Sequence, residues 1–411
     1  MLIRKGLGLP VMKTSKSQRL CRILDIGFIV ILLAFLAIGA VKTCFYPKEN
    51  NTYENRTANQ LPSFSAEKAL KGTFQDDVES AFSDQVFLAQ TMESSYHFGN
   101  RSLQLALISS VLDEDEDWDR YVCIFGAQTY GGSHLVFEVY DFDDCKKDMD
   151  SRIRHLNQLI ASYPELDFYS YYIEKETDLD LETGEKEGFS DYLRENLDLP
   201  EEKIGVFAVD DFDDLEKNFY RTDHHWNCEG SYRGYTDVLA MIDPDAEPLC
   251  PRAETMLPYP FSGSKASTTG ANGVFTENFK AYLFDYPAMD IAIDGNEVMD
   301  YGNQEAYWTG AAVDDLTYGD FYGADAGEVV FDTHRPEKGN ILVLGESYDN
   351  AILKLLAGHF NQTCAVDLRN YERECGQPFH FASYVRDHDI TKVLLIGNVD
   401  YYLSDCFNAG D

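Results

Sequence analysis

A carboxylate and two imidazoles stand together in one short segment, residues 221–226. In an extended chain, residues i and i+2 project from the same face, so Asp223 and His225 are expected to face one way and His224 the other. A carboxylate that holds an imidazole in one tautomer is the base half of a nucleophilic triad. The segment therefore predicts that His225 acts as a base and that Asp223 orients it.

The nucleophile that such a base needs is expected at Ser347. Residues 341–345 are four apolar residues and a glycine, a pattern typical of a buried strand that enters a tight turn before a helix. The N-terminus of a helix favours developing negative charge, and the backbone N–H of Ser347 can donate to an oxyanion there. We expect residues 221–226 and 341–348 to meet in space.

A second oxyanion or substrate-binding donor must come from another segment. Asn398 and Arg369 follow two predicted strands, at positions level with Ser347 if the sheet is parallel. Tyr348, next to the serine, is a further candidate for substrate binding. For Arg369 the alternative is a surface salt bridge.

Other interpretations of the histidines remain open. Residues 222–226 can also be a buried strand end whose histidines are satisfied by internal hydrogen bonds. A metal centre needs three or more convergent ligands. Since His224 is expected to face away, and no other histidine shows ligand spacing, the sequence predicts no metal and no cofactor.

The surrounding pattern predicts elements that would position these residues. Strand 341–344, helix 350–358, strand 363–368, helix 379–388 and strand 392–396 form a βαβαβ series, which is typical of a parallel sheet. Upstream we expect helices at residues 146–163, 190–197 and 231–242, and strands at 121–125, 134–140, 167–173 and 203–209. Residues 250–338 favour irregular or antiparallel structure. Residues 65–110 are helical in pattern, with an apolar face at positions 74, 78, 82, 86 and 87 that is expected to be core.

The first forty-two residues indicate the compartment. Residues 1–22 carry six basic residues and no acid, and residues 26–41 are uncharged. Counted from residue 23, the run approaches the roughly 30 Å thickness of a hydrocarbon core at about 1.5 Å per residue. The positive-inside rule then places residues 43–411 outside. A cleaved signal peptide is the alternative, because Ala37-Ile38-Gly39 has the small-residue spacing of a cleavage site.

Charge and cysteine content narrow the function classes. The formal net charge is −37, which repels nucleic acid and anionic lipid and excludes nucleic-acid binding. The chain has nine cysteines without a CxxC or other metal-type spacing. Outside a membrane disulfides are permitted, and 364–375 or 228–250 are plausible pairs.

Residues 222–226 resemble the signature of the DHHW-motif proteins, which are similar to the alginate O-acetylation proteins of the SGNH hydrolase-like superfamily. In those proteins the Asp and His of an Asp-x-His-Trp segment join a serine in a downstream Gly-x-Ser turn, which corresponds here to Asp223, His225 and Ser347. Residues 367–369 and 397–398 also resemble that pattern. One departure is Glu346, which replaces the aspartate usual before the serine.

The resemblance implies an SGNH hydrolase-like three-layer α/β domain with a parallel sheet at residues 121–411. It would follow a cytoplasmic tail (1–22), a transmembrane helix (23–42) and a linker with a helical region (43–120). The implied function is transfer of acetyl groups onto a cell-surface polysaccharide, with a membrane-embedded acyl-exporting partner. A carbohydrate esterase with the same triad and a non-catalytic glycan-binding module are the alternatives.

Overall fold

A computed structural model of the chain describes residues 16–48, 50–51, 56–71, 73–86, 127–130, 134–137, 139–181, 183–269, 275–310 and 316–409, with a few isolated residues between 92 and 103. The strand expected at residues 121–125 lies outside the described residues. The chain divides into two compact units, residues 1–51 with 57–91 and residues 52–56 with 92–411.

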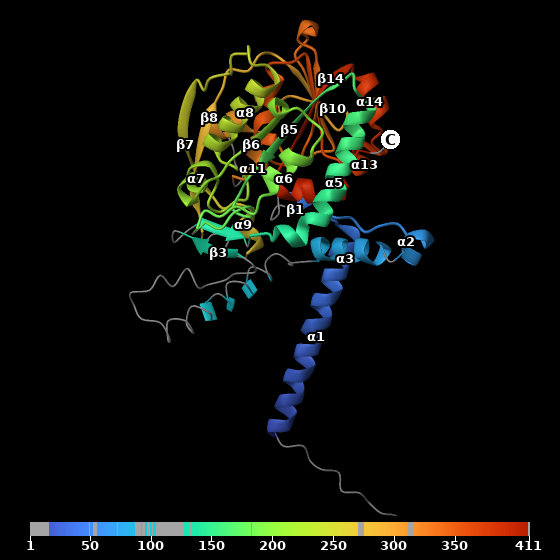
Figure 1. The fold of residues 1–411 in the computed structure, drawn as a ribbon. Coiled ribbons are helices and arrows are strands. Elements are labelled where there is room, and N and C mark those ends of the chain that lie inside the picture. The colour runs from blue at the N-terminus through green and yellow to red at the C-terminus, as the bar shows by residue number, and fades with distance from the viewer. Residues whose placement is uncertain are drawn as a thin grey trace, which may run out of the picture. The chain divides into compact units, whose positions relative to one another are not determined.

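The first unit contains the long helix α1 (Lys16–Phe45), drawn in blue in Figure 1. Its segment Ile26–Thr43 has a mean hydropathy of 2.4, and 6% of it is buried. Within the described residues it is the one helix long and apolar enough to cross a membrane, by length and composition. A signal sequence near the N-terminus would have the same properties.

The rest of the first unit comprises β1 (Asn50–Asn51), α2 (Ala66–Lys71) and α3 (Thr73–Gln85), and the boundary between the two units falls within the two-residue strand β2 (Arg56–Thr57). Gln85 accepts the backbone N–H of Lys48 at 2.7 Å, and its carbonyl accepts the hydroxyl of Thr43 at 3.1 Å. These bonds tie the end of α3 to the chain leaving α1. Of the apolar face expected to be core, Phe82 is 53% exposed, positions 74, 78 and 86 are half-buried, and position 87 lies outside the described residues.

The second unit is built around an eight-stranded sheet in the order β10-β9-β11-β13-β12-β14-β5-β6. Its strands are β5 (Asp167–Ile173), β6 (Ile204–Phe207), β9 (Asp290–Ile293), β10 (Asn296–Val298), β11 (Glu328–Asp332), β12 (Asn340–Leu344), β13 (Gln362–Val366) and β14 (Ile390–Gly397). The five neighbouring strands β13, β12, β14, β5 and β6 are parallel to one another. The remaining pairs, β10 with β9, β9 with β11 and β11 with β13, are antiparallel. The predicted βαβαβ series is present and the sheet is mostly parallel, as expected. Its antiparallel strands β9, β10 and β11 lie within residues 250–338, for which irregular or antiparallel structure was expected.

The β9–β10 hairpin at the antiparallel edge arises from local turn chemistry. Asp294 and Gly295 connect β9 to β10 with φ angles of 49° and 75°. Two consecutive left-handed residues make the tight turn that suits a hairpin, and Asp-Gly is a favoured pair there. Two further antiparallel pairs, β3 (Ala127–Tyr130) with β4 (His134–Phe137) and β7 (Ala253–Phe261) with β8 (Glu277–Leu283), lie outside the main sheet.

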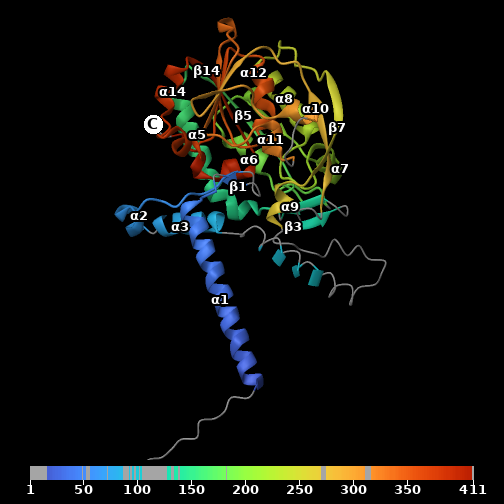
Figure 2. The same ribbon diagram turned by 180° about the vertical axis from the view of Figure 1, so that it is seen from behind.

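Helices cover both faces of the sheet (Figures 1 and 2). One face carries α8 (Cys228–Ile242), α11 (Tyr318–Tyr322) and α12 (Asn350–Ala357), and the other carries α5 (Phe142–Ser162), α6 (Phe189–Asn196), α13 (Tyr371–Cys375), α14 (Phe381–Asp387) and α15 (Val399–Leu403). Along β12, Ile341 and Val343 enter the first core and Leu342 and Leu344 the second. A strand buried on both faces reads as a continuous apolar run, which is why β12 was predictable. Three shorter helices, α7 (Phe212–Asn218), α9 (Ser264–Thr268) and α10 (Gln304–Thr309), lie in the connections.

The suggested disulfide pairings were wrong, since all four cysteines are free. Cys364 is buried in β13, where its Sγ lies 3.6 Å from Nδ1 of His388. Cys375, at the end of α13, instead lies 3.9 Å from Asp294. The two sulfurs therefore point into different surroundings.

Candidate active site

Ser347 lies in the turn between β12 and α12, at the carboxyl edge of the parallel strands. Gly345 begins this turn, and a β-carbon there would overlap the Oδ2 of Asp349. Glycine therefore leaves room for the Asp349 side chain, which would have to move if residue 345 carried a β-carbon. Ser347 is 8% exposed, so its hydroxyl lies near the surface but is largely screened from water.

The segment before α8 adopts a succession of bends rather than an extended strand. Asp223 Oδ1 accepts the backbone N–H of His225 at 3.0 Å, which closes an Asx turn. Glu277 fixes the start of the segment by accepting both the N–H and the hydroxyl of Thr222, each at 2.7 Å. Trp226 fixes its end, because it is fully buried and packs against Gly234 of α8.

The bent segment and the serine turn meet, as the sequence predicted. His225 Nδ1 lies 2.6 Å from Asp223 Oδ1, and His225 Nε2 lies 2.8 Å from Ser347 Oγ. The other oxygen of Asp223 accepts the backbone N–H of Ser264, at the start of α9, at 2.7 Å. Asp223 and His225 are both buried. The three side chains thus form a continuous hydrogen-bonded relay from carboxylate to hydroxyl.

The environment of Asp223 keeps it ionised. Burial by itself would raise its pKa, but the imidazole of His225, then His224 and the N–H of Ser264, hold the pKa well below its usual range. A carboxylate that stays charged at neutral pH can orient His225 and stabilise it as an imidazolium.

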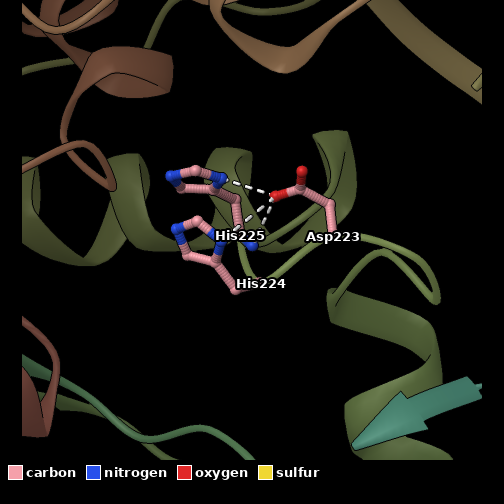
Figure 3. A group of neighbouring side chains, drawn as sticks. All are labelled: Asp223, His224 and His225. Atoms are coloured by element: carbon pink, nitrogen blue, oxygen red, sulfur yellow. Dashed lines mark hydrogen bonds and ion pairs between the residues drawn. The ribbon is translucent and has the colours of Figure 1, made fainter. Parts of the chain in front are cut away.

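His224 does not face away, and this expectation was wrong. The rings of His224 and His225 lie one over the other beside the Asp223 carboxylate, with centroids 3.9 Å apart (Figure 3). The Asx turn causes this, because it bends the chain so that both imidazoles leave on the same side. The backbone carbonyl of His224 accepts the hydroxyl of Tyr348, and its Nδ1 is hydrogen-bonded to the hydroxyl of Ser264.

The same geometry removes the reason for expecting no metal. Asp223, His224 and His225 offer three ligand atoms that all lie within 4.8 Å of one another. Nitrogen and carboxylate oxygen suit zinc. Coordination by His225 through Nδ1 would, however, replace its hydrogen bond to Asp223, so the relay and a metal compete for the same atoms.

Tyr318 is a part of the site that sequence reasoning missed. Its ring stacks on His225 with centroids 3.8 Å apart and planes 3° apart, on a side chain that is 2% exposed. His225 therefore lies between two rings, His224 and Tyr318. Tyr318 is in a Gly- and Tyr-rich stretch without periodicity, so no local signal marks it. The roles of Ser264 and Glu277 likewise depend on tertiary contacts.

The candidate oxyanion donors differ in whether their polar groups already have hydrogen-bond partners. No described residue accepts the backbone N–H of Ser347. Asn398 follows β14 at the same sheet edge, and its Oδ1 caps α15 by accepting the N–H of Asp400 at 2.7 Å. Arg369 follows β13, but its guanidinium is held by Asp367 at 2.6 Å and Asp325 at 3.5 Å.

Tyr348 does not face the substrate side, contrary to expectation. It is fully buried, and its hydroxyl is used on the carbonyl of His224. The reason is the turn after β12, which directs Ser347 outward and its neighbour inward. Tyr348 thus links the nucleophile turn to the Asp-His segment.

The fold and site define an α/β protein with a Ser-His-Asp relay at the carboxyl edge of its sheet. No protein-family model and no curated protein match the chain. It is similar to the structure of PatB1 from Bacillus cereus with a sulfonyl adduct, with 19% identity and a TM-score of 0.51, over 69% of this chain and 97% of that one.

Two other solved structures carry the names that the motif suggested. A DHHW family protein from Eubacterium siraeum has 16% identity and a TM-score of 0.49, over 70% of this chain and 95% of that one. The O-acetyltransferase domain of AlgJ from Pseudomonas putida has 10% identity and a TM-score of 0.39, over 68% and 92%. The resemblance drawn from residues 222–226 is thus confirmed as a likeness, and at these identities it concerns the fold.

Proposed function

We propose that this protein is a serine acyltransferase that uses Ser347, His225 and Asp223 as its catalytic triad. The observation that carries the proposal is the relay of 2.6 Å and 2.8 Å hydrogen bonds joining the three side chains. Ser347 Oγ attacks the acyl carbonyl while His225 Nε2 takes its proton, and Asp223 stabilises the resulting imidazolium. His225 then gives the proton to the leaving group, and an acyl-serine remains.

In the second half of the cycle an acceptor hydroxyl replaces the leaving group. His225 removes the proton of that hydroxyl, its oxygen attacks the acyl-serine, and the proton returns to Ser347 as the new ester departs. The negative oxygen formed in each half would be stabilised by the backbone N–H of Ser347 at the mouth of α12 and by the side-chain amide of Asn398.

The acyl group and acceptor are proposed from the motif. The resemblance of residues 222–226 to DHHW-motif proteins supports an SGNH hydrolase-like domain, an acetyl group and a cell-surface polysaccharide as acceptor. A membrane-embedded acyl exporter is the proposed partner. If water is the acceptor, the same triad makes a carbohydrate esterase. If the relay is unused, the domain is a glycan-binding module.

The triad is tested by sulfonylation. PatB1, which shares this fold, has been obtained with a sulfonyl adduct, and sulfonyl fluorides sulfonylate activated serines with loss of fluoride. We expect phenylmethylsulfonyl fluoride to modify Ser347 in the intact chain, as read by peptide mass spectrometry. His225→Ala should abolish the adduct, whereas Ser162→Ala, at an exposed serine, should leave it unchanged. A folded protein that takes no adduct would favour the glycan-binding module.

Turnover then separates the remaining candidates. An acetyl ester donor is supplied with and without an oligosaccharide acceptor. Transfer of label to the oligosaccharide supports a transferase, and release of free acetate alone supports an esterase.

We also propose that α1 anchors the protein in the membrane with residues 43–411 outside the cytoplasm. The apolar stretch Ile26–Thr43 and the basic residues before it support this. Protease added to intact cells should remove the outer part and leave a short anchored fragment. A full-length chain after treatment contradicts it, and a mature N-terminus near residue 40 would show a cleaved signal peptide.

A further inference from the structure

A small cavity opens beside Ser347, where β12 and β13 end and β11 begins. Its volume is about 20 Å³, which is room for one water-sized group. Besides Ser347, its polar lining consists largely of carboxylates: Asp325, Glu346, Asp349 and Asp367. Buried carboxylates this close together beside Ser347 need a proton or a cation to offset their charge.

In the described part of the chain, Glu346 and Asp349 make no ion pair, although the charge of Arg369 acts on both from a greater distance. Arg369 holds Asp367 and Asp325. Glu346 is 7% exposed, and its Oε1 is fully buried without a hydrogen-bond partner, while its Oε2 lies 3.2 Å from Ser347 Oγ. Asp349 is 6% exposed and accepts no capping hydrogen bond from α12. Both side chains line the cavity.

An unpaired buried carboxylate is unfavourable unless it takes up a proton or meets a cation. Burial, followed by the charges of neighbouring acids, raises the pKa of Asp349 well above its usual value, and burial also raises the pKa of Glu346. A positive group in the cavity would relieve both effects. The chain is thus arranged to receive a cation next to its nucleophile.

The geometry favours an ammonium group over a metal ion. Among the described residues, three donor atoms close enough to share one metal ion are found at Asp223, His224 and His225, not at these acids. An ammonium group donates three hydrogen bonds to acceptors spaced more widely around it. The cavity volume admits one such group and excludes a trimethylated one. The net charge of −37 also draws cationic ligands toward the protein.

We propose that this cavity is a subsite for a primary ammonium group of the substrate, so that the protein acts on esters that carry a free amine near the reacting carbonyl. The inference rests on the proposed acyl transfer at Ser347. The amine can belong to the alcohol part, as in an amino sugar, or to the acyl part, as in an aminoacyl ester. In both cases Glu346 and Asp349 are its acceptors.

Two matched substrate pairs distinguish these sources. The first compares methyl 6-O-acetylglucosaminide with its N-acetylated form, and the second compares a glycyl with an acetyl ester of methyl glucoside. In one of the two pairs, we expect the substrate with the free amine to have a KM about tenfold lower than its partner. A tenfold difference corresponds to about one hydrogen bond to a charged group. Preference in the first pair assigns an amino sugar, and preference in the second an aminoacyl group. Equal KM within both pairs overturns the subsite.

Variants connect the preference to the cavity. In the preferred pair, the ratio of the two KM values should approach one in Asp349→Asn and also in Glu346→Gln. If Asp349→Asn does not fold, Glu346→Gln provides the test. Asp191→Asn, an exposed acid on α6, should keep the ratio. A ratio unchanged in both cavity variants contradicts the proposal.

A binding measurement keeps this test separate from that of the proposed function. Ser347→Ala protein is titrated with glucosamine and glycine methyl ester, and with their N-acetylated forms, by calorimetry. Amine-dependent binding that Asp349→Asn removes would support the subsite even if the wild-type protein shows no acyl transfer, which is the result that would refute the proposed activity. Turnover without a preference for the amine would support the proposed activity and refute the subsite.

Discussion

The ring of Tyr318 lies parallel to the imidazole of His225, with centroids 3.8 Å apart and planes 3° apart. His224 covers the opposite face at 3.9 Å. The two rings thus fix the orientation of the His225 imidazole, which contacts Asp223 through one nitrogen and Ser347 through the other. The contact is apolar and flat, so it fixes orientation without competing for either nitrogen. Tyr318 is therefore a positioning residue in the proposed mechanism.

Replacing Tyr318 should separate its ring from its hydroxyl. Tyr318→Phe keeps the stacked ring, so we expect kcat to change little. Tyr318→Leu removes the flat contact, and a shift of about 1 Å in the base can cost about 10²-fold in rate. Acyl-transfer kinetics should show this loss in kcat with KM nearly unchanged.

The control for this prediction is Tyr371→Leu, a buried tyrosine in the core on the other face of the sheet. It should lower the thermal midpoint without lowering kcat of the folded protein. Equal kcat in Tyr318→Leu and Tyr318→Phe would mean that Tyr318 only fills space.

Tyr348→Phe should loosen the link between the nucleophile turn and the Asp-His segment. The change leaves the partly buried carbonyl of His224 without its donor, which costs about 1 kcal/mol of unfolding free energy. We expect kcat to fall as well, because His225 and Ser347 lose a shared anchor. Urea unfolding and kinetics measure the two effects.

Tyr401→Phe is the matched comparison, because the Tyr401 hydroxyl donates to the carbonyl of Leu344 at 2.9 Å without touching the Asp-His segment. It should lose similar stability and keep kcat. A parallel loss of kcat in both variants would assign the effect to general destabilisation.

The triad could be predicted from the sequence because its signals are local. Four apolar residues and a glycine place Ser347 after a buried strand, and the strand and helix patterns that follow it determine the parallel half of the sheet. Asp223 and His225 are recognisable as a pair because they are two residues apart in the chain.

Other features depend on conformations that the sequence leaves open. An Asp-His-His segment fits both an extended strand and an Asx turn, and the hydrogen bond from His225 N–H to Asp223 decides for the turn. Asp294-Gly295 lay in a stretch without long periodic runs, so its hairpin was missed. The contact of Tyr318 with His225 joins residues far apart in the chain and has no local signal.

Zinc should inhibit the proposed activity through His224. Asp223, His224 and His225 can offer three ligand atoms to one ion, and an ion held there would disrupt the relay to Ser347. We expect added Zn²⁺ to lower turnover and EDTA to restore it. His224→Phe keeps a ring over His225 but removes both nitrogens, so it should weaken zinc inhibition while kcat falls less than about tenfold. If EDTA instead abolishes the activity of untreated protein and Zn²⁺ restores it, the site is a metal centre.

The stability of the protein should depend on pH through His134. This side chain is 1% exposed, and neither ring nitrogen has a partner in the described chain. Burial first, and then the charges of Lys265 and Arg221, hold the pKa of His134 well below its usual value. Above about pH 6.5 the ring is neutral in both folded and unfolded chains, and it has no effect on stability. Below that pH the unfolded chain takes up a proton that the folded chain does not, so the free energy of unfolding decreases as pH falls.

His134→Phe isolates this contribution, because the buried acids that titrate in the opposite sense are common to both proteins. Phenylalanine can keep the edge-to-face contact that His134 makes with Phe212 at 5.6 Å. We expect the unfolding free energy of the wild type, measured in urea from pH 8 to pH 5, to fall relative to the variant by about 1.4 kcal/mol per pH unit below pH 6.5. His134→Leu provides a second apolar replacement should phenylalanine be too large. Parallel curves for the wild type and both variants would mean that the folded protein protonates His134 as readily as the unfolded chain does.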